Sequence, residues 1–223
     1  MNFNTNFEPH LSALLFLGTA GSLLVLTVAS IVFVFSRRQL LRYSVGAMIV
    51  LVIGYAALLL GFSGFSHDRT LSPGDEKYFC ELDCHLAYSV QQVQRFKQIG
   101  DTTPGGQFYV VTVRTRFDEK TIASWRGNGP YSPSPPAITI VDERGREIPP
   151  SAAGQAAWNA LHGASHPLSE SLRPGESYET TLVFDIPKEL QRARLLATFE
   201  DFPTPFLIGD EGSLLHKKTY FEL

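Results

Sequence analysis

The sequence predicts a membrane α-helical hairpin followed by an all-β domain built as an antiparallel β-sandwich. Charged residues make up only 18% of the 223-residue chain, whereas a soluble domain usually carries about 25%. The shortage is confined to the first 65 residues, because the remaining 158 residues hold 37 of the 41 charged side chains. That second part consists of short strand-like segments separated by turn residues, so the two parts of the chain belong to different structural classes.

The hairpin is predicted from two apolar runs, residues 11–35 and residues 43–65, neither of which carries a charge. As helices these runs would be about 37 Å and about 35 Å long, enough to cross a hydrocarbon core of about 30 Å. Residues 1–10 contain no Lys or Arg, and a signal peptide begins with a positive segment. The first run is therefore predicted to be an uncleaved membrane helix.

The orientation follows from three arginines, Arg37, Arg38 and Arg42, which lie between or next to the two runs. Positively charged loops stay in the cytoplasm, so both termini and the C-terminal domain are predicted to be extracytoplasmic, at a bacterial inner (plasma) membrane. The predicted organisation is an N-terminal tail over residues 1–10, the hairpin over 11–65, a polar linker over 66–75 and the β-domain over 76–223.

Partners are predicted from the same two parts. The hairpin should contact the lipid bilayer and other membrane-protein subunits. Gly18, Gly21, Gly54 and Gly61 would let helix backbones approach closely, either within the hairpin or against another subunit. The part beyond residue 65 has 16 basic and 21 acidic residues, which excludes a basic surface for nucleic acid.

The β-domain is predicted from segments that alternate polar and apolar residues or are rich in β-branched and aromatic residues. Pro-Gly, Asn-Gly and similar turn pairs separate them. One Ala-rich stretch, residues 151–162, predicts a short helix instead. The predicted strands are residues 86–93, 108–117, 137–141, 178–186, 195–199 and 215–221.

The candidate site is the segment that holds both cysteines of the chain, Cys80 and Cys84, followed directly by His85. Free thiols are unusual in an oxidising compartment, so the two cysteines should be engaged. They could form a disulfide, provided that the chain turns between them, because an extended strand would hold their Cα atoms about 13 Å apart. They could instead bind a metal, since thiolates and imidazole are ligands that copper and zinc prefer.

The layout resembles subunit II of haem-copper oxidases, in which a two-helix hairpin precedes an exported β-domain with a Cys-x-x-x-Cys motif. That resemblance implies a copper centre at Cys80 and Cys84. The family has a His four residues after the second Cys, where this chain has Tyr88, and a Met ligand, whereas the methionines here are Met1 and Met48. A mononuclear copper site of Cys80, Cys84, His85 and a fourth ligand remains open. The candidates for the fourth ligand are His216, His162 and His166.

Two further hypotheses use the same segment. Cys-x-x-x-Cys-His resembles a haem c attachment motif with one extra spacer residue, with His85 as the axial ligand. A thiol redox pair is the other hypothesis, although Glu81 and Asp83 between the cysteines would oppose thiolate formation. In a metal site these two acids would tune the centre electrostatically.

A second resemblance concerns the fold. Residues 172–176, Leu-Arg-Pro-Gly-Glu, and residues 182–187, which end in Phe-Asp-Ile-Pro, are similar to bacterial exported immunoglobulin-like domains. Together the two resemblances imply an immunoglobulin-like or cupredoxin-like sandwich. The sequence predicts no catalytic residue. The favoured hypothesis is an accessory or electron-transfer subunit of a membrane complex with copper at Cys80, Cys84 and His85. The alternatives are a non-catalytic structural or binding subunit with a Cys80–Cys84 disulfide, and a haem c carrier.

Overall fold

The computed structural model describes residues 2–80, 84–122, 125–190, 192–199 and 201–223. The chain divides into two compact units. The β unit comprises Met1–Asn4, Asp68–Phe199 and Lys218–Leu223, and the helical unit comprises Thr5–His67 and Glu200–Lys217. The division differs from the predicted one, since the first residues of the tail and most of the predicted linker belong to the β unit, and a late segment belongs to the helical unit.

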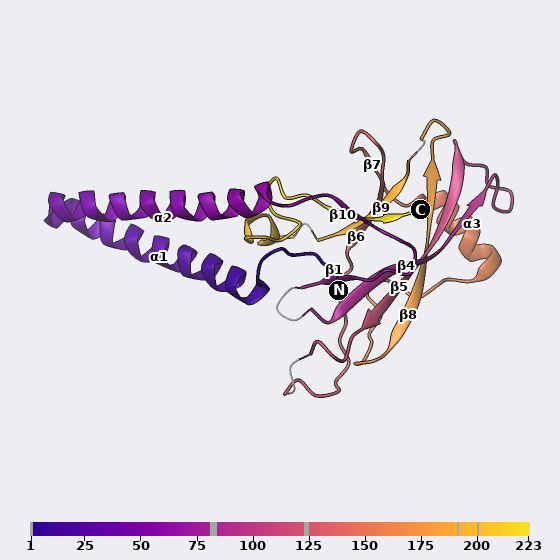
Figure 1. Ribbon diagram of the computed structural model, residues 1–223, viewed down its shortest axis with the longest axis horizontal. Coiled ribbons are helices and arrows are strands. Elements are labelled where there is room, and N and C mark those ends of the chain that lie inside the picture. The colour runs from indigo at the N-terminus through magenta and orange to yellow at the C-terminus, as the bar shows by residue number, and fades with distance from the viewer. Residues whose placement is uncertain (1, 81–83, 123–124, 191, 200) are drawn as a thin grey trace. The chain divides into compact units, whose positions relative to one another are not determined.

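The helical unit is built on two long helices, α1 (Pro9–Ser36) and α2 (Arg38–Gly64), which run side by side in Figure 1. Pro9 occupies the first turn of α1, where its missing N–H costs nothing. Arg37 separates the helices, with an extended backbone at φ −152°. Both helices are long and apolar enough to cross a membrane, as the sequence predicts.

The burial pattern of this hairpin is the reverse of that in a water-soluble helix pair. Its buried side chains include serines, and the hydroxyls of Ser30 and Ser44 lie 2.8 Å apart in a buried hydrogen bond between the helices. Its exposed side chains are large and apolar, such as Val25 at 67% exposure and Phe35 at 89%. Hydroxyl pairs inside and bulky apolar groups outside are typical of helices packed in lipid.

The predicted glycine contacts within the hairpin are wrong. A Cβ atom added at Gly18, Gly21, Gly54 or Gly61 would meet no atom of another segment within 4 Å. The two helices therefore meet elsewhere, including at the Ser30–Ser44 pair.

In the part of the chain that the structure describes, the β unit contains two five-stranded sheets. The first sheet has the order β1 (Asn2–Phe3), β3 (Lys77–Phe79), β4 (Leu86–Phe96), β5 (Gln107–Phe117) and β8 (Ser177–Ile186). The second sheet has the order β2 (Arg69–Leu71), β10 (Thr219–Glu222), β9 (Arg194–Thr198), β6 (Ala137–Val141) and β7 (Glu147–Ile148).

The prediction of a purely antiparallel sandwich is wrong, because both sheets are mixed. The pairs β1–β3 and β2–β10 are parallel, and the other pairs are antiparallel. Both parallel pairs lie at a sheet edge and join segments that are far apart in the sequence. Strand β2 lies inside the predicted linker, and the last strand begins at Thr219 and not at Leu215.

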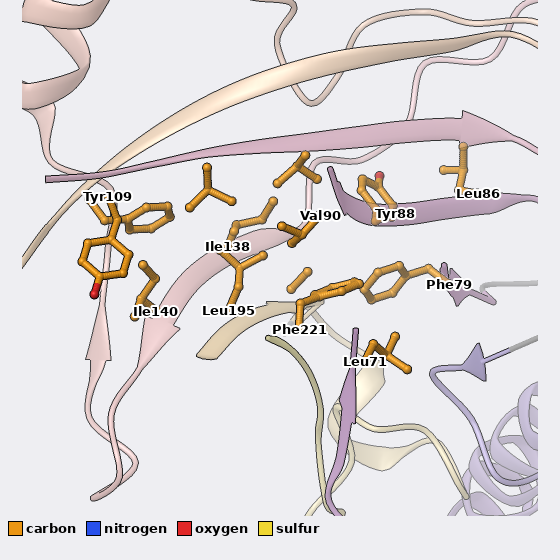
Figure 2. Close-up of a cluster of buried hydrophobic side chains, with 14 of the residues drawn as sticks. Leu71, Phe79, Leu86, Tyr88, Val90, Tyr109, Ile138, Ile140, Leu195 and Phe221 are labelled. Atoms are coloured by element: carbon orange, nitrogen blue, oxygen red, sulfur yellow. The ribbon is translucent and has the colours of Figure 1, made fainter. Parts of the chain in front are cut away.

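The two sheets share one hydrophobic core. Figure 2 shows Phe79, Tyr88 and Val90 of the first sheet directed toward side chains of the second sheet. The second-sheet residues labelled there are Leu71, Ile138, Ile140, Leu195 and Phe221. Strands β4 and β5 are the longest of the first sheet. Their alternate residues therefore make up the larger part of the side chains that the first sheet contributes to the core.

Helix α3 (Ala152–His162) packs on strand β8 through a second, smaller apolar cluster. Ser151 caps the helix, its side chain accepting a hydrogen bond from the Gly154 N–H at 3.2 Å. Phe108 and Val183 from the first sheet are buried against Trp158. The strands beneath α3 are therefore covered on both faces, which explains the nearly continuous apolar run in β5.

Candidate site at the cysteine loop and the neighbouring polar cluster

The two cysteines form a disulfide, with the Sγ atoms of Cys80 and Cys84 2.03 Å apart and their Cα atoms 4.1 Å apart. Strand β3 ends at Phe79 and strand β4 begins at Leu86, and these two residues face each other in the antiparallel pair. The disulfide therefore closes the connection between the two strands. Glu81 and Asp83, predicted as tuning acids, lie outside the described residues.

The start of this connection is held by Asn4, the residue that follows strand β1. Asn4 donates its backbone N–H to the Tyr78 carbonyl at 2.9 Å, and its side-chain carbonyl accepts the Cys80 N–H at 3.0 Å. Cys80 itself is buried, at 5% exposure. The predicted N-terminal tail thus contributes to the structure around the disulfide.

His85 follows the disulfide and lies among aromatic rings. Its imidazole is 4.7 Å from the ring of Phe117 and 5.0 Å from the ring of Tyr131, measured between ring centroids. The guanidinium of Arg126 lies 4.8 Å from the same Phe117 ring. The His85 carbonyl accepts the Asp118 N–H at 2.7 Å, so both the ring and the backbone of His85 help to join β4 to the end of β5.

The other predicted ligands do not join Cys80 and Cys84 in a described cluster. His216 belongs to the helical unit and precedes β10, and its Nδ1 lies 2.7 Å from the Lys217 carbonyl. The His162 ring stacks on Trp158 at 4.0 Å, and His166 Nδ1 is 3.7 Å from a Glu170 carboxylate oxygen. Among the described residues, no group of three His, Cys, Asp or Glu side chains is placed to hold a metal ion.

A copper or haem centre does not fit this arrangement of the described residues. Copper ligation needs thiolates and haem attachment needs thiols, and the bond between Cys80 and Cys84 leaves neither. Tyr88, at the position of the family's histidine ligand, is fully buried in the core against Phe79. Metal or haem binding by Cys80, Cys84 and His85 therefore stays a prediction for the reduced chain.

Beside the disulfide, a polar cluster formed by Glu76, Tyr78, Arg116 and Asp118 lies on one face of the first sheet. The two ends of the Arg116 guanidinium bind the two carboxylate oxygens of Glu76, each at 2.6 Å. The same guanidinium donates to the Tyr78 hydroxyl at 2.8 Å and to the Asp118 carboxylate at 3.1 Å. Tyr78 in turn donates to Asp118 at 2.7 Å, so one cation joins all three partners.

The register of three strands builds this cluster. Tyr78 of β3 faces Ala87 of β4, and Ala87 faces Arg116 of β5. Since residues directly opposite each other on paired strands point to the same face, the side chains of Tyr78 and Arg116 stand on the same side. The methyl group of Ala87 is small enough to let them meet across the middle strand. The sequence alone does not reveal this cluster, because its members come from segments 40 residues apart.

The charges in the cluster are mutually stabilised. The Arg116 hydrogen bonds lower the pKa of the Glu76 carboxyl below its usual value. Burial opposes ionisation of Asp118, but hydrogen bonds from the Lys120 N–H, Tyr78 and Arg116 outweigh it and lower its pKa. Burial, together with hydrogen bonds to the two carboxylates, raises the pKa of the Tyr78 hydroxyl.

These shifts suit a structural cluster better than acid–base catalysis. A general acid or base works best with a pKa near the working pH, and here both carboxyl pKa values move down while the tyrosine pKa moves up. Lys77 is also used structurally. It is fully buried, and its ammonium donates to the Ala197 and Thr219 carbonyls of the second sheet at 2.7 and 3.1 Å.

Comparison with known proteins assigns no family. No family model and no curated protein matches the chain. A conserved hypothetical protein from Bacillus anthracis is 18% identical over 56% of this chain and 89% of that chain, with a TM-score of 0.39. The secreted protein MPT63 from Mycobacterium tuberculosis is 12% identical over 70% and 98% of the two chains, with a TM-score of 0.41. The yjhA protein from Bacillus subtilis is 14% identical over 68% and 98%, with a TM-score of 0.40. Likeness at this level assigns neither a fold family nor a function.

Proposed function

We propose that this protein is a membrane-anchored accessory subunit whose β unit lies outside the cytoplasm and has a structural or binding role, without catalysis of its own. The Cys80–Cys84 disulfide carries the proposal. Disulfides persist in oxidising compartments and are rare in the cytosol. A bond that closes the connection at the end of β3 therefore favours an extracytoplasmic location for the β unit.

Membrane anchoring is supported by the surface of the helical unit. Val25, Phe35 and Val50 are 67%, 89% and 71% exposed, and few of the described residues of either helix are buried. In water such an apolar surface would drive aggregation, whereas in a bilayer it would contact lipid chains that are equally apolar. Arg37, Arg38 and Arg42 at the tip of the hairpin favour a cytoplasmic tip, and this orientation agrees with the location inferred from the disulfide.

The accessory role is supported by how the polar groups beside the disulfide are used. The Glu76 and Asp118 carboxylates are bound by Arg116, and Lys77 connects the two sheets. These are contacts that fix a fold. Of the hypotheses from the sequence, the structural or binding subunit with a disulfide is therefore the best supported, whether its sandwich is immunoglobulin-like or cupredoxin-like.

The proposal is tested on the full chain in membranes. Thiol titration of the unfolded chain should find no free thiol without reductant and two free thiols after reduction. For orientation, single cysteines are added at Leu161, which is 59% exposed on α3, and at exposed Gln39 near the hairpin tip. A membrane-impermeant maleimide should label position 161 and not position 39 in intact spheroplasts, and both after permeabilisation. Free thiols in the isolated chain, or the opposite labelling pattern, would overturn the proposal.

One further measurement distinguishes the proposed structural role from the hypothesis of a copper site at Cys80, Cys84 and His85. The purified full chain is assayed for copper before and after reduction, alongside a His85→Ala variant. Copper bound in stoichiometric amount by the reduced wild type, and lost in the variant, would favour the electron-transfer role. We expect no such difference between the two proteins.

A further inference from the structure

The segment between β9 and β10, residues 201–217, belongs to the helical unit although it connects two strands of the β unit. Tyr55 in α2 donates its hydroxyl to the Phe206 carbonyl at 2.6 Å. Phe16 in α1 lies 6.0 Å from Phe202, measured between ring centroids. In Figure 1 the yellow segment lies beside the end of α2. The 201–217 segment thus packs against both helices of the hairpin.

Further contacts fix the same segment to the ends of the hairpin. Asn6, just before α1, donates its backbone N–H to the Gly209 carbonyl at 2.8 Å. Just after α2, the Ser66 hydroxyl accepts the Lys217 N–H at 2.8 Å. A short 3₁₀ helix, η1 (Thr204–Phe206), shapes the part between them. The segment is therefore a folded element of the helical unit.

The side chains of this segment are distributed as if its outer face met an apolar solvent. Phe202 is 76% exposed, Phe206 49%, Leu214 57% and Leu215 74%. In the same segment Asp210 and Glu211 are buried, at 6% and 2%. A water-facing loop shows the reverse distribution, because acidic residues are almost always exposed. Four large apolar groups on one short segment therefore indicate contact with something apolar.

The position of the segment along the helices identifies this solvent. Tyr55 lies 17 residues beyond Arg38 in α2, which is about 26 Å along the helix axis. Phe16 lies 19 residues before Phe35 in α1, about 28 Å away. A hydrocarbon core is about 30 Å thick, so with the arginine tip at one border, the residues that hold the segment lie near the opposite border.

We propose that the 201–217 segment is an interfacial membrane-binding loop. It inserts Phe202, Phe206, Leu214 and Leu215 into the headgroup and upper acyl region of the outer leaflet. The inference rests on the proposed spanning of the membrane by α1 and α2. Aromatic and aliphatic side chains of peripheral elements bind lipid at this depth, and Tyr55 beneath the loop matches the preference of tyrosine for the interface. The loop would fix how far the hairpin can slide along the membrane normal.

The test uses the full chain, purified and reconstituted alone in lipid nanodiscs. A nitroxide is attached to one new cysteine at a time, at Phe206 or Leu215, without reductant so that the native disulfide stays closed. Val28, which is 56% exposed within α1, marks the hydrocarbon core, and Leu161 on α3 marks water. Collision rates are measured with oxygen, which concentrates in lipid, and with a water-soluble nickel chelate.

Labels at positions 206 and 215 should lose most of their collisions with the nickel chelate and gain collisions with oxygen, relative to position 161. If either variant misfolds, as judged by the helical circular dichroism of the purified chain, labels at Phe202 and Leu214 replace it. Nickel collisions at 206 and 215 equal to those at 161, with position 28 protected, would overturn the lipid contact alone. Protection of 206 and 215 only in native membranes would assign the face to another protein. Nickel access at position 28 would overturn the proposed spanning itself.

Discussion

The strongest quantitative prediction concerns Arg116 in the polar cluster. Replacing it with Met keeps an unbranched apolar stem but removes the cation shared by Glu76 and Asp118. Glu76 is 29% exposed at its side chain and can regain water, whereas Asp118 is only 4% exposed. The main cost is therefore one carboxylate left buried without a positive partner.

The size of this effect follows from the partners that Asp118 keeps. Removing one member of a buried ion pair costs about 3–5 kcal/mol. Asp118 still accepts hydrogen bonds from Tyr78 and from the Lys120 N–H, so the lower end applies. We expect Arg116→Met to lower the free energy of unfolding by about 3 kcal/mol. For a unit of this size that corresponds to a fall in Tm of roughly 6–12 °C.

The assay is urea unfolding of the full chain in nanodiscs, followed by tryptophan fluorescence. Both tryptophans, Trp125 and Trp158, belong to the β unit, and Trp158 packs against Phe96. Arg114→Met is the matched control. Arg114 lies two residues earlier on the same strand face and makes one hydrogen bond to the Ser177 hydroxyl, at 3.0 Å, so its loss should cost about 1 kcal/mol or less. Equal losses for the two variants would refute the reasoning. So would an Asp118→Asn change that fails to restore any stability to Arg116→Met.

Three further predictions use the same unfolding measurement. Lowering the pH below about 4.5 should destabilise the wild type more steeply than Arg116→Met. The pKa values of Glu76 and Asp118 are lowered in the folded state, so their stabilisation is present above the unfolded pKa values and is lost as the pH falls; parallel pH profiles would contradict this. A Cys80→Ser, Cys84→Ser double variant should lose about 2 kcal/mol, the loop-closure entropy of so short a loop, and reductant should then have no further effect on it. Gly106→Ala should destabilise the β unit by more than 2 kcal/mol, roughly the upper range of overpacking costs. Its new Cβ would overlap the Ile186 carbonyl, whereas at the neighbouring Gly105 the nearest atom would be an Asp185 carboxylate oxygen at 3.5 Å. A Gly105→Ala loss as large as that of Gly106→Ala would count against this explanation.

The sequence predicts those helices and strands that have a clear local pattern of apolar residues. The helices α1 and α2 are uncharged over more than 20 residues, and β6 coincides with the predicted strand over residues 137–141. The strands that escaped prediction, β1, β2, β3 and β7, have only two or three residues each. Such segments show no periodicity, and they become strands only because a distant neighbour offers hydrogen bonds, as β3 does for β1.

The polar cluster could not be predicted for a related reason. Arg116 is recognisable as a charge in a strand, but its partners depend on the register of β3, β4 and β5. A shift of one residue would turn its side chain to the opposite face. The register in turn depends on the core, where Tyr88 and Phe117 must point inward. Long-range packing therefore decides which polar residues meet.

The cysteine motif shows how the same limit affects a functional hypothesis. Cys80, Cys84 and His85 are close in the sequence, and the spacing alone is compatible with a disulfide, a metal site or haem attachment. What separates these alternatives is the pairing of Phe79 with Leu86, because it makes residues 80–85 the connection between two antiparallel strands. Paired strands lie about 5 Å apart, so a connection that returns between them can bring two cysteines within disulfide range. The three-residue strand β3, directly before Cys80, sets this geometry, and a segment so short has no periodicity from which a strand could be predicted.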